Sequence, residues 1–151
     1  TGEDIYLKEN FRPLLESGGV GVIHPDLLTT GGILETKKIG DMAQDYGVAM
    51  AMHMAESPIG CMAAVHAAAA TENFMVLENH SVDVPWWNEI VNGLPKPIVQ
   101  DGFIRVPDDP GLGIESLNDE VIAAHLDPED PGLWEPTDQW NDDRSHDRLW
   151  S

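Results

Sequence analysis

The sequence has 151 residues, of which 27 are acidic and 8 are basic, so its formal net charge at pH 7 is −19. This length is enough for one domain with a hydrophobic core. The negative charge opposes binding to nucleic acid phosphates and to anionic lipid, so neither nucleic acid nor membrane is an expected partner. Adaptation to high salt is an alternative explanation of the acidity. An anionic substrate would need an electropositive element, such as a metal ion, on so acidic a protein.

Cys61 is the only cysteine, which excludes a disulfide within the chain. It lies in an apolar helical run, where we expect an inert core thiol. No segment is long and apolar enough to span a bilayer. The chain opens on Thr1-Gly2-Glu3 without an initiator methionine, so we expect the back part of a longer protein. We also expect a cytoplasmic location.

Apolar runs of strand length alternate with segments of helical periodicity over residues 1–80. Alternation with short loops is typical of βαβ units, so the predicted fold class is α/β with a parallel sheet and the helices outside it. The predicted strands are the tail of a strand at residues 1–4 and complete strands at 20–25, 48–54 and 74–77. The middle run, at 48–54, is continuously apolar, as expected of a strand covered on both faces. The predicted helices are residues 7–17, 33–46 and 57–70.

The pattern changes after residue 80, so we divide the chain into residues 1–80, 81–126 and 127–151. The last part is read as an ordered extended tail, because its tryptophans need a surface to pack on, with a disordered acidic tail as the alternative. The predicted segments after residue 80 begin with an aromatic-rich stretch that contains a short helix (81–94) and a β-hairpin around Asp101-Gly102 (97–107). A tight turn (108–113), a helix capped by Asn118 (118–126) and the tail with Trp134, Trp140 and Trp150 follow.

A polar residue stands at the end of each of the four predicted strands: Glu3, Asp26, His53 and Glu78. The carboxyl ends of parallel strands meet at one rim, which is where α/β barrels and open α/β sheets place their chemistry. We therefore expect the four side chains to gather there. His24 lies two residues before Asp26 and shares its strand face, so it points either into the same cavity or into the core.

The order and spacing of these residues resemble the enolase superfamily, and more narrowly the mandelate racemase / muconate lactonizing enzyme family with its acid-sugar dehydratases. The resemblance implies a (β/α)8 TIM-type barrel joined to a smaller α+β capping domain. This chain would supply about strands five to eight and a C-terminal segment that returns toward the cap. A whole barrel needs about 250 residues, so two more metal carboxylates would lie in an N-terminal part outside this chain. The matching residues are Gly2-Glu3, Pro25-Asp26, Gly31-Gly32, His53, Ser57-Pro58, Glu78 and the PGLG at 110–113.

The resemblance also implies roles for the polar strand ends. Glu3 would be a Mg²⁺ ligand, with a helix-capping carboxylate as the alternative. His53 and Asp26 would form a His–Asp dyad for acid–base catalysis, with a buried histidine and a helix N-cap as the alternatives. Glu78 would bind substrate or assist as an acid, with a pKa raised by neighbouring carboxylates, or it would form a rim salt bridge. The position of His24 on the strand, rather than the resemblance, makes it a candidate substrate-binding residue if it points into the cavity.

The function implied is Mg²⁺-dependent dehydration of a sugar acid, an aldonate or aldarate. Removal of the α-proton would give a metal-stabilised enediolate, and His53 would then expel the β-hydroxyl as water to give a 2-keto-3-deoxy acid. A racemase, epimerase or cycloisomerase acting through the same intermediate is the first alternative. A barrel with a structural or regulatory role and no catalysis is the second. The expected partners are the small-molecule substrate, further copies in a homo-oligomer and the missing N-terminal part.

Overall fold

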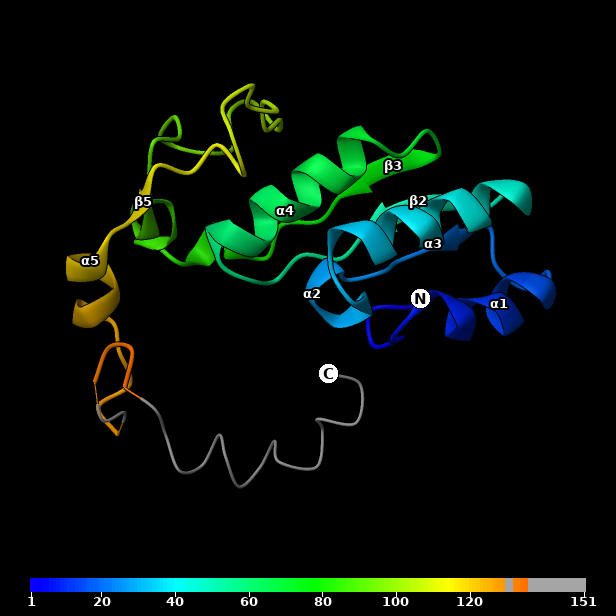
Figure 1. Ribbon diagram of the computed structural model, residues 1–151, viewed down its shortest axis with the longest axis horizontal. Coiled ribbons are helices and arrows are strands. Elements are labelled where there is room, and N and C mark those ends of the chain that lie inside the picture. The colour runs from blue at the N-terminus through cyan, green and yellow to red at the C-terminus, as the bar shows by residue number, and fades with distance from the viewer. Residues whose placement is uncertain (130–131, 136–151) are drawn as a thin grey trace.

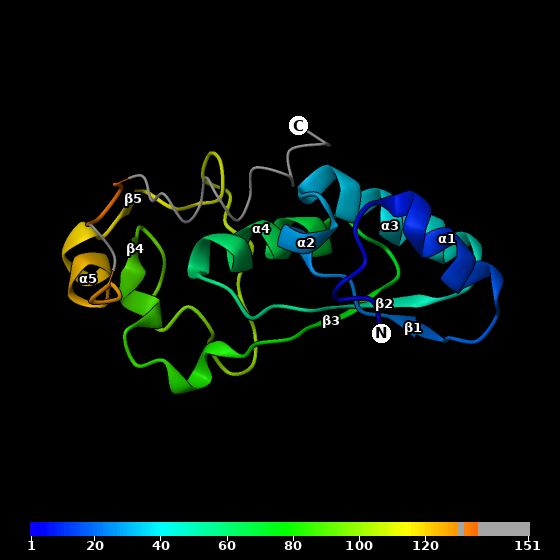
Figure 2. The same ribbon diagram turned by 90° about the horizontal axis from the view of Figure 1, so that it is seen from below.

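The computed structural model describes residues 1–129 and 132–135 of the chain. A three-stranded parallel sheet carries its helices on one face, and a second region with a two-stranded antiparallel sheet follows along the chain (Figures 1 and 2). The helices are α1 (Lys8–Glu16), α2 (Leu27–Thr30), α3 (Ile33–Asp45), α4 (Pro58–Ala69) and α5 (Asp119–Ala124), with 3₁₀ turns η1 (Ser81–Asp83) and η2 (Trp87–Ile90). The strands are β1 (Val22–Ile23), β2 (Ala49–Met52), β3 (Phe74–Leu77), β4 (Val91–Asn92) and β5 (Ser116–Leu117).

The parallel sheet confirms the predicted α/β class. Its strand order is β1-β2-β3, and both pairs are parallel. Helices α1 to α4 cover one face, as right-handed crossovers require (Figure 2). The other face is less covered: β2 alternates half-buried and buried residues, and Met75 and Val76 of β3 are 59% and 52% exposed. The expectation that the strand at 48–54 is covered on both faces is therefore wrong for this chain.

Two apolar clusters hold the described part together. The first lies between the sheet and helices α1, α3 and α4, and its fully buried members include Phe11, Ile39 and Met50. The second joins α4 to the region after residue 80 and contains Cys61 and Trp87. Burial raises the pKa of the Cys61 thiol to about 12, which agrees with the inert core thiol predicted from the sequence.

Gly40 sets the distance between α3 and the loop before β3. A Cβ at this position would lie 2.6 Å from Thr71 Cγ2 and 3.3 Å from Met50 Sδ. Thr71 is buried and β-branched, so it has little freedom to move away. We expect Gly40→Ala to destabilise the protein by about 1–3 kcal/mol in chemical denaturation, despite the better helix propensity of alanine. Gly21→Ala is the matched control, since a Cβ there meets no atom within 4 Å; equal stability of the two variants would contradict the packing argument.

Residues 1–4 do not form the predicted strand tail. They make a turn in which the Ile5 amide donates to the Gly2 carbonyl at 3.1 Å. One contact of strand type remains, because the His24 amide donates to the Thr1 carbonyl at 2.8 Å. That contact holds the segment beside β1.

The second region differs from the prediction in its short elements. At 97–107 only the centre of the predicted hairpin is present: Gln100 and Phe103 exchange backbone hydrogen bonds of 2.8 and 2.9 Å around Asp101-Gly102. Asp101 and Gly102 have φ values of 51° and 82°, the left-handed conformation of a tight hairpin turn. The antiparallel pair of β4 and β5 was not predicted, since two-residue strands carry no periodicity.

Asn118 caps α5 as predicted, accepting a hydrogen bond from the Val121 amide at 3.3 Å, although the helix ends at Ala124 rather than Leu126. His125 stacks on Trp86 with ring centroids 4.2 Å apart. Trp134 is 69% exposed, so its predicted packing is wrong. Among the described helices none has the length and apolar character to cross a membrane. The residues of the tail that lie outside the described part include Trp140, Arg144, His146, Arg148 and Trp150.

Candidate active site

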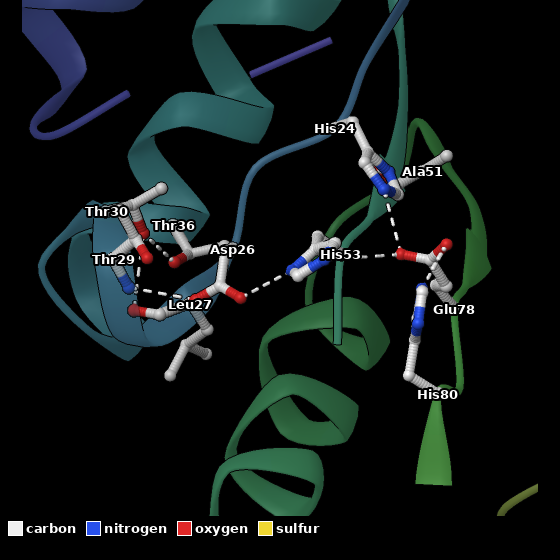
Figure 3. A network of polar contacts seen from close by, with 10 residues as sticks. All are labelled: His24, Asp26, Leu27, Thr29, Thr30, Thr36, Ala51, His53, Glu78 and His80. Carbon is white, nitrogen blue, oxygen red and sulfur yellow. Dashed lines mark hydrogen bonds and ion pairs between the residues drawn. The ribbon is translucent and has the colours of Figure 1, made fainter. Parts of the chain in front are cut away.

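Three of the predicted site residues meet at the carboxyl ends of adjacent strands. Asp26 follows β1, His53 follows β2 and Glu78 follows β3 (Figure 3). The ladder continues past the assigned strands: the His53 amide donates to the Pro25 carbonyl at 3.0 Å and the Glu78 amide to the Met52 carbonyl at 2.9 Å. Parallel register therefore brings the three side chains to one rim, as the sequence predicted.

Asp26 and His53 form the predicted dyad. The Nδ1 atom of His53 lies 2.7 Å from Asp26 Oδ2. The other oxygen of Asp26 accepts a hydrogen bond from the Thr29 amide at 2.9 Å, which makes Asp26 the N-cap of α2. Asp26 thus makes both contacts weighed for it from the sequence, one to His53 and one to the start of α2, and its catalytic role stays a prediction. With Nδ1 donating to the carboxylate, the Nε2 atom of His53 is left for substrate.

The charges of the dyad reinforce each other. Burial opposes ionisation of Asp26, but hydrogen bonds from Glu56 and His53 outweigh it and lower the pKa of Asp26. Burial also opposes protonation of His53, but the hydrogen bond and charge of Asp26 outweigh it and raise the pKa of His53. The pair is therefore biased toward carboxylate and imidazolium, the form that can donate a proton from Nε2.

Glu78 is surrounded by three histidines. His80 Nε2 lies 2.8 Å from Oε1, His24 Nε2 lies 3.0 Å from Oε2 and His53 Nε2 lies 3.7 Å from the same Oε2. Hydrogen bonds from His80 and His24 lower the pKa of Glu78. The raised pKa predicted for Glu78 is wrong, because histidines rather than carboxylates are its nearest neighbours.

His24 points toward the site rather than into the core, which was one of the two orientations that the sequence left open. Its Nδ1 donates to the Ala51 carbonyl at 2.7 Å, and its ring lies 5.3 Å from that of His53, centroid to centroid. Asn79, which follows Glu78, makes a local contact, since its Oδ1 accepts from the Ser81 amide at 2.9 Å.

Glu3 is half-exposed in the N-terminal turn and is not among the described acidic and histidine side chains that gather within 4.8 Å of one another. A hydrogen bond from its own backbone amide lowers the pKa of Glu3. Glu3 is therefore an ionised oxygen donor at neutral pH, the kind of group that binds Mg²⁺. Its role as a metal ligand stays a prediction.

Sequence reasoning missed Glu56, which lies in the loop between β2 and α4. Its carboxylate approaches Asp26 and His53, with one ligand atom of each residue within 4.8 Å of the others. The Trp87 indole donates to the Glu56 carbonyl at 2.8 Å and fixes the loop. Burial, followed by the hydrogen bond and charge of Asp26, raises the pKa of Glu56 to about 7. The available signal was a glutamate three residues after the dyad histidine, just before a helix start.

Replacing Glu56 by Gln is expected to remove one component of the pH dependence of stability. The pKa of Glu56 rises on folding from the ordinary 4.5 to about 7. The folded state then binds more protons, so Glu56 makes the free energy of unfolding decrease as pH rises from 4.5 to 7. Thermal melts across this range should show that decrease reduced in Glu56→Gln and retained in Glu16→Gln, a change of an exposed glutamate. Parallel pH curves for all three proteins would contradict the assignment.

Known proteins resemble this chain in sequence over most of its length. The family described as "Enolase C-terminal domain-like" matches residues 1–121. A D-xylonate dehydratase from Haloferax volcanii is 42% identical over 126 residues, covering 83% of this chain and 30% of the relative. A D-galactonate dehydratase from Variovorax paradoxus is 34% identical over 136 residues, covering 86% of this chain and 35% of the relative. The chain thus spans about a third of the length of these relatives.

Solved structures extend the likeness to the fold. A mandelate racemase/muconate lactonizing enzyme-like protein from Rubrobacter xylanophilus superposes with a TM-score of 0.80 at 36% identity, over 87% of this chain and 33% of its own. A mandelate racemase/muconate lactonizing enzyme from Jannaschia sp. gives a TM-score of 0.75 at 33% identity, and the match covers 89% of this chain and 33% of that protein. The chain supplies part of the barrel domain of such proteins. It therefore belongs to the enolase superfamily, in the family of enolase C-terminal domain-like proteins.

Proposed function

We propose that the protein containing this chain dehydrates a sugar acid to a 2-keto-3-deoxy acid. The observation that carries the proposal is the 2.7 Å contact between His53 Nδ1 and Asp26 Oδ2, which leaves Nε2 as a positioned proton donor. The names of two relatives, D-xylonate dehydratase and D-galactonate dehydratase, support the reaction and the substrate class.

Each of the proposed site residues in this chain has its own role in the reaction. The imidazolium of His53, held by Asp26, donates the Nε2 proton to the β-hydroxyl as the carbon–oxygen bond breaks, and water leaves. Glu78 and His24, joined at 3.0 Å, bind the substrate hydroxyls beside His53. The base that removes the α-proton lies outside this chain. Tautomerisation of the resulting enol gives the 2-keto-3-deoxy acid.

Mg²⁺ is the proposed cofactor, and Glu3 is the residue of this chain that would hold it. The ionised, half-exposed Glu3 carboxylate fits a hard cation that prefers oxygen donors. When bound, Mg²⁺ supplies positive charge to the substrate carboxylate and makes the α-proton more acidic. The other ligands would come from outside the chain. The cytoplasmic location and the homo-oligomer are also part of the proposal.

The test is a screen of the intact protein with Mg²⁺ against aldonic and aldaric acids, beginning with D-xylonate and D-galactonate. Product is detected with a reagent for 2-keto-3-deoxy acids. The proposal predicts turnover of at least one acid and its loss when a chelator removes the metal. Absence of product from every acid would count against dehydration, and exchange of the α-proton in that case would favour the racemase, epimerase or cycloisomerase alternative.

A further inference from the structure

We propose that His24, His53 and Glu78 form a second divalent-metal site, selective for a transition metal such as Zn²⁺ or Co²⁺ and distinct from the Mg²⁺ site assigned to Glu3. One ligand atom from each of the three side chains lies within 4.8 Å of the other two. The side chains are 25%, 23% and 35% exposed respectively, so an ion can reach them. Two imidazoles and one carboxylate are a donor set typical of Zn²⁺, Co²⁺ and Fe²⁺ sites.

The two histidine rings are already oriented as metal ligands. Histidines that bind metals donate their other ring N–H to a carboxylate or a backbone carbonyl, which fixes the tautomer. Here His24 Nδ1 lies 2.7 Å from the Ala51 carbonyl oxygen and His53 Nδ1 lies 2.7 Å from Asp26 Oδ2. Both Nε2 atoms are thereby left for a ligand, and both face the same oxygen of Glu78 (Figure 3). Binding an ion would displace the proton that His53 Nε2 carries in the imidazolium form.

The spacing of the donor atoms fits a small ion. Ligands at about 2.1 Å around a tetrahedral ion lie roughly 3.4 Å from one another. Glu78 Oε2 is 3.0 Å from His24 Nε2 and 3.7 Å from His53 Nε2. Since His24 Nδ1 donates to a carbonyl, Nε2 and the Glu78 oxygen can meet at 3.0 Å only through a shared proton. A bound metal ion would replace that proton.

A neighbouring group, Asp26, His53 and Glu56, also has three donor atoms within 4.8 Å, but it is a weaker candidate. Its Asp26 oxygens are already engaged, one by His53 Nδ1 and the other by the Thr29 amide at the start of α2. An ion bound there would weaken both the dyad contact and the helix cap, because it would compete with them for the Asp26 oxygens. The site at His24 and Glu78 needs neither change.

The ion would occupy the Nε2 atom that the proposed function uses as its acid. Imidazole nitrogen suits Zn²⁺ and Co²⁺, whereas Mg²⁺ prefers oxygen, so Mg²⁺ in excess should not displace the ion. Transition metals should therefore inhibit turnover. This consequence rests on the proposed function, but binding of the ion does not.

Binding is tested by titrating the intact protein with Co²⁺ in excess Mg²⁺ and following the visible absorption of the bound ion. We expect a band that saturates at one equivalent and disappears when Zn²⁺ is added. His24→Asn keeps a donor near the Ala51 carbonyl but removes Nε2, so Co²⁺ affinity should fall on the order of 100-fold. His125→Asn is the matched control, because His125 Nδ1 also contacts a backbone carbonyl, that of Val121 at 2.9 Å.

Glu78→Gln should also weaken Co²⁺ binding, which provides a second variant if His24→Asn does not fold. A wild-type protein with no saturable band, or folded His24→Asn and Glu78→Gln proteins with the wild-type band, would overturn the proposal. The titration does not depend on substrate. A protein that binds Co²⁺ but dehydrates no acid would therefore contradict the proposed function alone.

Discussion

Replacing His53 by Asn should reduce dehydration turnover by about 10²–10⁴-fold, the usual contribution of a positioned acid or base. An asparagine amide can replace Nδ1 as the donor to Asp26, so the contact that is 2.7 Å long in the wild type has a substitute. What is lost is Nε2, the proton donor. Steady-state kinetics on the substrate found in the screen measures the effect, with circular dichroism to establish that the variant is folded.

His66→Asn, in the last turn of α4, is the control for the loss of a histidine as such. We expect it to retain most of the turnover. A folded His53→Asn protein whose turnover is within a few-fold of the wild type would remove His53 from the mechanism.

Replacing Asp26 by Asn is expected to lower turnover by up to about 10⁴-fold, as loss of the carboxylate does in other carboxylate–histidine pairs. The side-chain oxygen of the introduced asparagine can still accept from the Thr29 amide and cap α2, a contact of 2.9 Å in the wild type. Its amide nitrogen would then face His53 Nδ1 and favour the tautomer that carries its proton on Nε2. The imidazolium would lose its counter-charge.

The diagnostic readout for Asp26→Asn is the pH–rate profile. Asp26 raises the pKa of His53, so the variant should lose its acid form at lower pH than the wild type does. Asp26→Ala should show the same kinetic loss and, in addition, a stability loss of about 1 kcal/mol from the missing helix cap. An unchanged pH–rate profile in Asp26→Asn would mean that the carboxylate does not act on His53.

The rim of the site was predictable because it depends on backbone register. Once residues 20–25, 48–54 and 74–77 are placed as parallel strands, Asp26, His53 and Glu78 must lie side by side at the strand ends. The structure shortens the first two strands but keeps that register. The same argument fails for Glu3, because residues 1–4 form a turn rather than a strand.

The rest of the site depends on side-chain directions that periodicity does not encode. His80 follows Glu78 by two residues, and its Nε2 lies 2.8 Å from Glu78 Oε1. This contact reverses the predicted direction of the Glu78 pKa shift. Glu56 lies in a loop, where no period indicates which way a side chain points. The four-residue helix α2 is too short to leave an apolar pattern, so the helix predicted after Asp26 was the one at residues 33–46.

Incubation of D-xylonate, the substrate named for one relative, with the intact protein and Mg²⁺ in D₂O tests the central claim most directly. Proton and carbon NMR follow both the remaining acid and the product. The account predicts a 2-keto-3-deoxy acid that carries solvent deuterium at carbon 3, with D-galactonate as the next substrate if D-xylonate does not react. Deuterium at the α-carbon of the recovered acid, with no keto product from either substrate, would contradict dehydration and indicate racemisation or epimerisation.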